Sequence, residues 1–158
     1  RRRVLRRFFT AYLTAKQKFQ TVWADDELLG AALWAPPGKW KTTPAEDLSL
    51  VPAMLQPRLL LRAPMVGWGM LGAERRHPPG PDHFYLAALG VSPAAQGKGL
   101  GSALIEPVLE TCDRDGVPAY LEASKFENIA YYARHGFRQT GEIRLPRGPI
   151  VYPMWRDA

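Results

Sequence analysis

The chain is poor in several features that define whole classes of protein. Its 158 residues include one Cys, Cys112, and three scattered His, which rule out an internal disulfide and offer no metal-ligand spacing. No stretch approaches the roughly 18 apolar residues of a membrane span, and no signal-peptide pattern opens the chain. We therefore expect a metal-free protein of the reducing cytoplasm that does not enter a membrane.

The remaining composition is that of an ordinary globular protein. Apolar residues make up 46% of the chain, and the length suits one domain over residues 1–158 with a real core. The 21 Lys and Arg against 15 Asp and Glu leave a net charge of +6, which fits a polyanionic ligand or simple solubility. No basic-aromatic motif of RNA-binding modules is present, so we expect no nucleic-acid partner. Both a monomer and a homodimer fit the sequence.

Apolar periodicity and turn residues predict the order of the elements. Helices are expected over 1–20, 44–76, 102–114 and 128–135, and strands over 21–24, 28–34, 83–91, 117–123, 137–145 and 150–155. The central strand–helix–strand order predicts two parallel strands, and the hairpins predict antiparallel flanks. The expected fold is α/β, a mixed central sheet with its parallel pair in the middle and helices on both faces.

One stretch organises the chain, His83 to Ser102, which reads HFYLAALGVSPAAQGKGLGS. An apolar strand is followed by a glycine-rich turn and then by the start of a helix. The first N–H groups of a helix lack intrahelical partners and carry partial positive charge, so they attract anions. Glycines let a phosphate approach the backbone closely. The stretch therefore predicts a phosphate-binding turn.

Two common nucleotide-binding loops do not fit this turn. A Walker loop requires Gly-Lys followed by Ser or Thr, whereas Lys98 lies between two glycines. The dinucleotide fingerprint G-x-G-x-x-G requires unequal glycine spacing, whereas Gly97, Gly99 and Gly101 are each two residues apart. What does fit is Q-x-x-G-x-G, formed by Gln96, Gly99 and Gly101.

Further motifs follow in order downstream. Asn128 precedes Tyr132, and Tyr132-Ala-Arg-His-Gly136-Phe137 gives the pattern Tyr-x-x-x-Gly-Phe. Over residues 83–156 the chain resembles the GNAT superfamily of N-acetyltransferases. The residues of its motifs are most similar to those of the puromycin N-acetyltransferase-like subgroup. The resemblance implies the GNAT fold, with the family's first strand and helix missing before Arg1.

The resemblance also implies an activity. We expect an enzyme that moves an acetyl group from acetyl-CoA to a primary amine of a small molecule, by direct attack in a ternary complex. The alternatives are a non-catalytic acyl-CoA-binding sensor module and an acetyltransferase for protein or peptide amines. Trp34, Trp40 and Trp68 could line a pocket for an amphipathic amine or pack in the core.

The resemblance assigns the coenzyme-binding residues in two groups. The parallel strands should splay near Leu89, so that backbone groups of Leu89 and Val91 take the pantetheine amides and the acetyl carbonyl. The pyrophosphate is expected on the turn, held by Gln96, Gly97, Lys98, Gly99, Gly101 and Ser102. Asn128 corresponds to the pantetheine-contacting residue of the family, and it could also cap its short helix.

The expected catalytic residues are Tyr132 and Glu122. Tyr132 matches the family's general acid for the leaving thiolate, and its neighbour Tyr131 is expected to face the core. Glu122 is a carboxylate in an apolar strand, where burial should raise its pKa toward that of a general base acting directly or through a water. Glu122 could instead orient the substrate cation or satisfy a buried hydrogen bond. His83 is a second candidate base or a surface residue.

Overall fold

The computed structural model describes residues 10, 13, 19, 21–41, 77–144 and 148–158. Within these residues the chain forms seven strands, two α-helices and one short 3₁₀-helix. Their bounds are β1 Val22–Ala24, β2 Gly30–Ala35, β3 Phe84–Val91, η2 Pro93–Ala95, α5 Leu100–Asp115, β4 Ala119–Ala123, α6 Glu127–Ala133, β5 Arg138–Gln139, β6 Ile143–Arg144 and β7 Ile150–Arg156.

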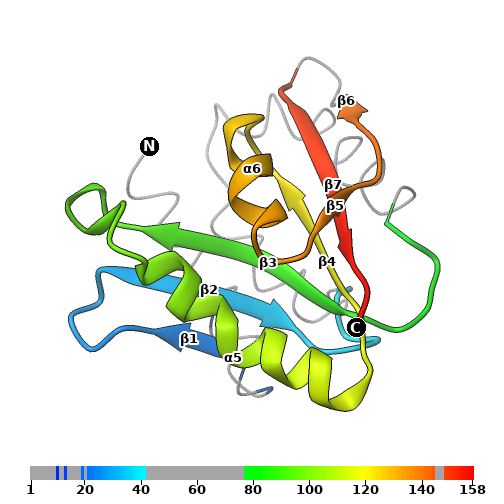
Figure 1. Cartoon of the computed structure of the whole chain (residues 1–158), viewed down its shortest axis with the longest axis horizontal. Helices are drawn as coiled ribbons and strands as arrows, with labels where there is room; N and C mark the ends of the chain where they lie inside the picture. Colours follow the sequence, from blue (N-terminus) through cyan, green and yellow to red (C-terminus); the bar gives the residue numbers. More distant parts are fainter. Residues whose placement is uncertain (1–9, 11–12, 14–18, 20, 42–76, 145–147) are drawn as a thin grey trace.

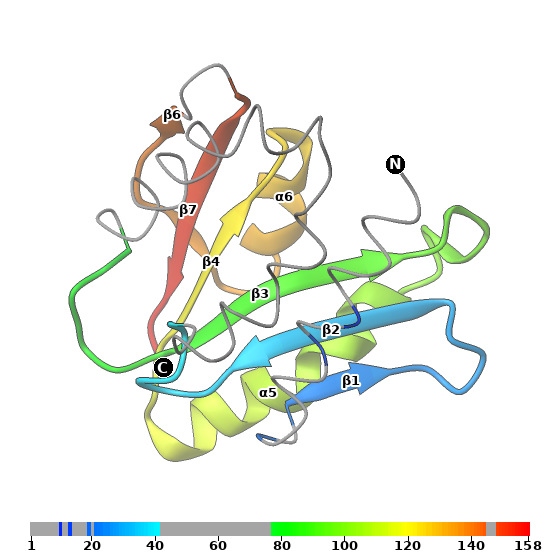
Figure 2. The same ribbon diagram turned by 180° about the vertical axis from the view of Figure 1, so that it is seen from behind.

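The strands form one mixed sheet in the order β1-β2-β3-β4-β7-β5, and β6 pairs with the first residues of β7. β3 and β4 are parallel, and every other pair is antiparallel. This confirms the predicted sheet, with its parallel pair in the middle. Helices α5 and α6 lie on the same face (Figures 1 and 2). The helices predicted over 44–76, and over 1–20 apart from three residues, lie outside the described residues.

Helix α5 covers one face of the sheet and contributes five residues to the core there. It begins after Gly99 and ends at Gly116, both with positive φ, a conformation that glycine adopts without strain. Its buried residues recur at helical spacing and are Leu104, Ile105, Val108, Leu109 and Cys112. They pack against inward-facing strand residues that include Trp34, Leu121 and Met154. The predicted helix end is confirmed, and the helix starts two residues earlier than predicted.

The strand predicted over 137–145 is two short strands, β5 and β6, which both pair with β7. The break falls opposite Pro153, which lies between β4 and β5 in the sheet and has no N–H to donate. Its carbonyl instead accepts the backbone N–H of Thr140 at 2.9 Å and the Thr140 hydroxyl at 3.2 Å. Because proline cannot continue the ladder on this side, the partner strand is interrupted there.

The parallel strands separate in the middle of the sheet. Their pairing runs from Phe84 with Ala119 to Leu86 with Leu121 and then stops. Beyond that point β3 continues beside β2, while β4 continues beside β7. Figure 1 shows β3 and β4 diverging toward their carboxyl ends. The splay expected near Leu89 therefore begins directly after Leu86 and leaves this edge of β3 without a β4 partner.

In the part of the chain that the structure describes, no helix combines the length and the apolar character needed to cross a membrane.

Candidate active site

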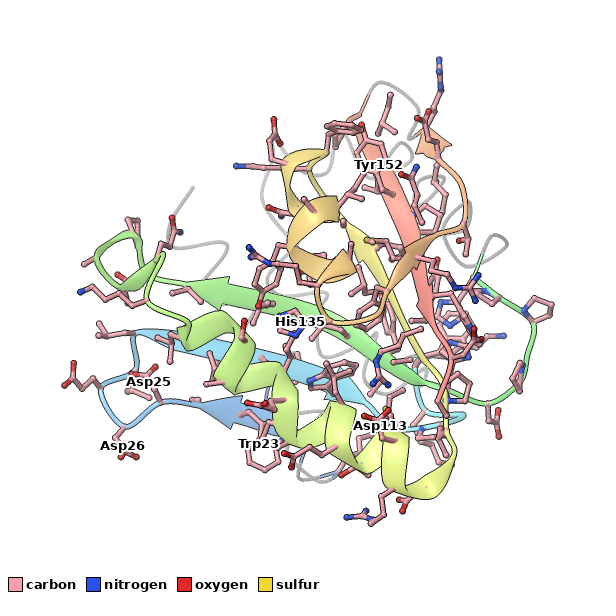
Figure 3. All side chains as sticks on the ribbon, in the orientation of Figure 1. Trp23, Asp25, Asp26, Asp113, His135 and Tyr152 are labelled. Atoms are coloured by element: carbon pink, nitrogen blue, oxygen red, sulfur yellow. The ribbon has the colours of Figure 1, made fainter. Side chains whose placement is uncertain are left out.

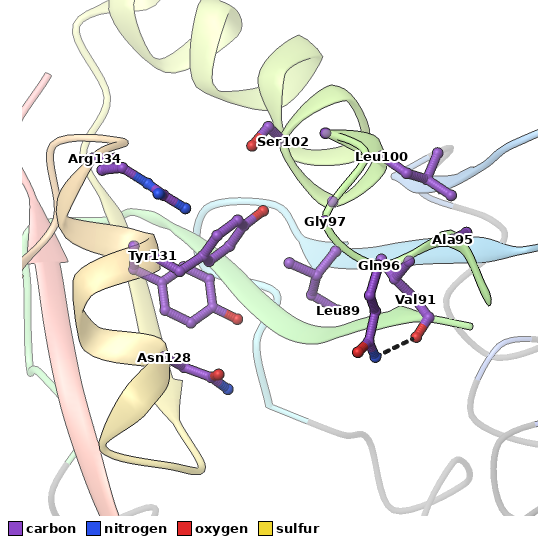
Figure 4. Close-up of a pocket in the computed structure, with 13 residues that line it drawn as sticks. Leu89, Val91, Ala95, Gln96, Gly97, Leu100, Ser102, Asn128, Tyr131 and Arg134 are labelled. Atoms are coloured by element: carbon purple, nitrogen blue, oxygen red, sulfur yellow. Dashed lines mark hydrogen bonds between the residues drawn. The ribbon is translucent and has the colours of Figure 1, made fainter. Parts of the chain in front are cut away.

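A pocket of about 450 Å³ opens between the start of α5 and the facing side of α6, with β3 as its floor (Figure 4). This volume lies within the usual range of small-molecule and cofactor sites. Its lining residues are Leu89, Val91, Ala95, Gln96, Gly97, Gly99, Leu100, Gly101, Ser102, Asn128, Tyr131, Tyr132 and Arg134. The structure thus gathers nine of the predicted coenzyme and catalytic residues around one space and leaves Lys98 and Glu122 outside its lining.

The glycine turn forms the polar wall of this pocket. Gly97 and Gly99 have φ values of 75° and 81°, and a Cβ placed on either would meet nothing within 4 Å. The backbone is therefore open to a close-approaching ligand. The first turn of α5 carries no acidic residue, which preserves the positive potential of the helix start. The Gln96 side-chain amide donates to the Val91 carbonyl at 3.0 Å and ties the turn to β3 (Figure 4).

Helix α6 forms the opposite wall. Asn128, Tyr131 and Tyr132 are spaced i, i+3 and i+4, so they share one face of the helix, and all three line the pocket. The N-cap is Phe126, so Asn128 lies inside the first turn and its interpretation as the helix cap is wrong. Tyr131 packs against the core as expected, but it also lines the pocket. Helical spacing from Asn128 is the sequence signal that would have placed Tyr131 in the pocket.

The two tyrosine hydroxyls differ in their surroundings. The Tyr131 hydroxyl is buried against the start of α5 and has no hydrogen-bond partner among the described residues. Burial raises the pKa of Tyr131, while nearby Ser102 and Arg134 act in the opposite direction. Burial, reinforced by Tyr131, raises the pKa of Tyr132 to about 12. The Tyr132 phenol therefore keeps its proton throughout the neutral range and can donate it.

Ser102 connects the start of α5 to the end of α6. Its hydroxyl lies 3.0 Å from Nε2 of His135, which follows α6 and sits between the two helices (Figure 3). Burial lowers the pKa of His135, as do Arg134 and Arg156, against an opposing effect of Glu106. The imidazole is therefore neutral near pH 7. Sequence reasoning did not place His135 or Arg134 at the site, because both occupy unspecified positions of the Tyr-x-x-x-Gly-Phe pattern.

The contact between Gly101 and Tyr131 gives a stability prediction. A Cβ on Gly101 would lie 2.9 Å from the Tyr131 hydroxyl oxygen, whereas the next atom is at 3.5 Å. Gly101→Ala should therefore cost about 1–3 kcal/mol of overpacking, more than the roughly 1 kcal/mol gained by replacing a helical glycine. In a Tyr131→Phe background the overpacking disappears, and the same substitution should become stabilising.

Urea unfolding of the four proteins of this double-mutant cycle measures the change. A Gly101→Ala effect of the same sign and size in both backgrounds would show that Tyr131 does not press on Gly101.

Glu122 lies on the other face of the sheet from the core residues Leu121 and Ala123, because side chains alternate along a strand. Its carboxylate accepts the Tyr85 hydroxyl at 2.9 Å and the Tyr120 hydroxyl at 3.1 Å. Burial raises the pKa of Glu122, and the two hydrogen bonds oppose this rise. Glu122 is the residue directly after the last parallel pair, Leu86 with Leu121, so it stands at the fork between β3 and β4.

His83 is buried rather than on the surface, with 3% of its area exposed. Its Nδ1 lies 2.7 Å from the Pro81 carbonyl and its Nε2 lies 2.9 Å from Nε2 of His77. Because a carbonyl can only accept, Nδ1 carries a proton, and Nε2 is within hydrogen-bond distance of His77. Both ring nitrogens are therefore engaged. The interpretation of His83 as a surface residue is wrong, since its burial depends on partners distant in sequence.

The observations so far define a class of protein. A glycine turn that leads into a helix start, a fork between parallel strands and a facing helix with an amide and two phenols form a cofactor-binding α/β domain. The sequence model of the acetyltransferase (GNAT) family matches residues 5–137, and the chain belongs to this family. It is thus a member of a family of acetyl-CoA-dependent acyltransferases, as the motif resemblance implied.

Individual relatives agree with this assignment. An uncharacterised N-acetyltransferase of Schizosaccharomyces pombe is 45% identical over 74 residues, which cover 46% of this chain and 30% of the relative. The chain thus matches less than a third of that curated protein. A crystal structure from Corynebacterium glutamicum, named histone acetyltransferase HPA2 and related acetyltransferase, is 27% identical with a TM-score of 0.64. That match covers 98% of this chain and 75% of the other.

A mosquito arylalkylamine N-acetyltransferase-like protein shares the fold, with 15% identity and a TM-score of 0.51 over 87% of this chain and 74% of its own.

Proposed function

We propose that this chain transfers the acetyl group of acetyl-CoA to a primary amine of a small molecule, by direct attack in a ternary complex. The observation that carries the proposal is the convergence of three elements on one pocket. The open glycine turn, the strand edge freed by the β3–β4 fork, and the protonated Tyr132 phenol all border the same space. Each suits a different part of a thioester coenzyme.

The pocket residues fit coenzyme A in the following way. N–H groups at Gly97, Gly99, Gly101 and Ser102 would hold the pyrophosphate, with Gln96 and Lys98 beside them. Arg134 lines the pocket with its guanidinium 5.7 Å from the Tyr131 ring centre and adds positive charge. The freed backbone of Leu89 and Val91, together with the Asn128 amide, would hold the pantetheine and orient the acetyl carbonyl.

Two side chains would move the protons. Glu122 takes a proton from the amine, directly or through a water, and the nitrogen lone pair then forms the new C–N bond as the C–S bond breaks. Tyr132 gives its proton to the leaving thiolate. Cys112 does not offer a competing covalent route: it is fully buried, and burial raises the pKa of its thiol to about 11, far from that of a reactive thiolate.

The acceptor is the finer part of the proposal. The motifs resemble those of the puromycin N-acetyltransferase-like subgroup, and this resemblance favours a small amphipathic amine. Trp40 stacks on His77 with ring centres 3.6 Å apart, and this pair adjoins the Tyr85 and Tyr120 rings beside Glu122. Trp34 lies in the α5-facing core. These aromatic rings, together with the Glu122 carboxylate, suit a cationic amine as the acceptor.

A protein amine is the second candidate. The Corynebacterium glutamicum structure, matched over nearly the whole chain, carries the name of a histone acetyltransferase. The experiment that separates the candidates measures free thiol released from acetyl-CoA in the presence of small arylalkylamines, nucleoside-like amines and Lys-rich peptides. Selective release with small amines supports the proposal, and selective release with peptides supports the second candidate. Binding of acetyl-CoA without release under any condition would indicate a sensor module.

A further inference from the structure

We propose that Tyr85 and Tyr120 form a clamp that positions the Glu122 carboxylate and keeps it ionised at the fork between β3 and β4. This inference rests on the proposed function, since it treats Glu122 as the group that accepts the amine proton. The two tyrosines are positioning residues, because they act through Glu122.

The clamp is built by the register of the sheet. Tyr85 pairs with Tyr120 across the parallel β3–β4 ladder, one step before that ladder ends. Tyr120 and Glu122 are two residues apart on β4 and therefore share a face. Three residues on two strands thus bring two phenols and one carboxylate together, and each carboxylate oxygen receives one O–H, at 2.9 Å and 3.1 Å.

The clamp is held rigid by the rings around it. The Tyr85 and Tyr120 rings stack with centres 5.9 Å apart. The His77 ring meets both of them edge-on, at 5.2 Å and 4.8 Å. The Trp155 ring lies 6.4 Å from that of Tyr120, which is completely buried. A phenol locked in this way loses little further freedom when it donates a hydrogen bond, so the carboxylate has one favoured position.

The arrangement leaves Glu122 able to react. A carboxylate has about four lone-pair positions, and the two phenols occupy one on each oxygen. The remaining positions are open to a substrate proton or to a bridging water. Glu122 is only partly buried, whereas Tyr120 is closed off from solvent. Tyr120 therefore lies on the closed side of the carboxylate, which itself stays within reach of solvent.

The charges around Glu122 come from few groups. On β3 and β4 its titratable neighbours are Tyr85 and Tyr120, and the residue paired with it on β7 is the uncharged Pro153. His77 and His83 touch the tyrosine rings from the segment before β3. Burial, followed by the neighbouring His83 and Lys41, lowers the pKa of His77 to about 4, so His77 adds no positive charge near pH 7. Within the described residues the phenols are therefore the groups that directly stabilise the carboxylate.

The test compares Tyr85→Phe, Tyr120→Phe and the double variant with the wild type. Carbon-13 NMR of glutamate-labelled protein gives the Glu122 titration without any need for turnover, and its signal is assigned by its disappearance in Glu122→Gln. Each single variant should raise the Glu122 midpoint by about one pH unit, as expected for the loss of one hydrogen bond to a charged group. The acidic limb of kcat/KM should move upward by the same amount.

Tyr152→Phe is the matched control. Tyr152 is on β7 opposite Ala123 and packs against Phe126, so its loss should leave both the midpoint and the limb in place. A Glu122 midpoint that does not move in either clamp variant overturns the clamp. If the Glu122 titration midpoint moves in an active variant but the acidic limb of kcat/KM stays in place, the positioning role of the tyrosines is wrong. Wild-type protein that titrates as expected but releases no thiol with any amine refutes the proposed function separately.

Discussion

Replacing Tyr132 by Phe is expected to lower kcat by about 10²–10⁴-fold, the range typical of a lost general acid, with little change in the affinity for acetyl-CoA. The phenol keeps its proton because burial raises its pKa to about 12, and it lines the pocket beside Asn128 and Leu89. Phe keeps the ring that packs in the core and removes only the proton donor. Steady-state kinetics together with calorimetric titration of acetyl-CoA measures the two effects separately.

The neighbouring variant Tyr131→Phe provides the decisive comparison. The Tyr131 hydroxyl lies close to Gly101 at the glycine-turn end of the pocket, so its removal should lower kcat far less. A large loss in Tyr131→Phe combined with a small loss in Tyr132→Phe would assign the acid to Tyr131. Turnover equal to that of the wild type in both variants would show that solvent protonates the leaving thiolate.

Replacing Glu122 by Gln is expected to lower kcat/KM near pH 7 by about 10²–10⁴-fold, because no carboxylate remains to take the amine proton. The loss should shrink as the pH rises toward the pKa of the amine, since an already neutral amine needs no base. In the wild type, the raised pKa of Glu122 should place the acidic limb above the ordinary range of glutamate. A pH–rate profile of both proteins measures these differences, with Glu110→Gln on the exposed side of α5 as the control.

The same pKa shift predicts how Glu122 affects stability. A carboxyl whose pKa is higher in the folded than in the unfolded state favours folding when protonated, and that contribution is lost as the pH rises through the folded value. Glu122→Gln should therefore be at least as stable as the wild type near pH 7. A strongly destabilised Gln variant would indicate that Glu122 serves the fold, and its lost activity would then say nothing about a base.

Local signals in the sequence predicted the parts of the fold that depend on neighbouring residues. The run of apolar residues to Val91, the glycine turn and the helix that ends at Gly116 were all predictable, because each rests on chain conformation within a few residues. The parallel pairing of β3 with β4 followed from the strand–helix–strand order. These elements contain most of the pocket lining, which is why most of the predicted coenzyme residues lie around one pocket.

The parts that sequence reasoning missed depend on contacts between distant segments. The break between β5 and β6 is set by Pro153, which belongs to another strand. His83 is buried because His77 and the Pro81 carbonyl engage its two nitrogens. The clamp on Glu122 requires the register that aligns Tyr85 with Tyr120, and no local pattern encodes that alignment. Tyr131 is different, because helical spacing from Asn128 did contain the information.

The most direct test of the account is whether this protein transfers the acetyl group to an amine without forming an acylated enzyme. Thiol release from acetyl-CoA should depend on added amine, each released thiol should match one N-acetylated product by mass spectrometry, and the protein itself should keep its unmodified mass during turnover. Thiol release that proceeds equally without amine, or an acetylated protein that forms and decays during turnover, would contradict direct transfer in a ternary complex.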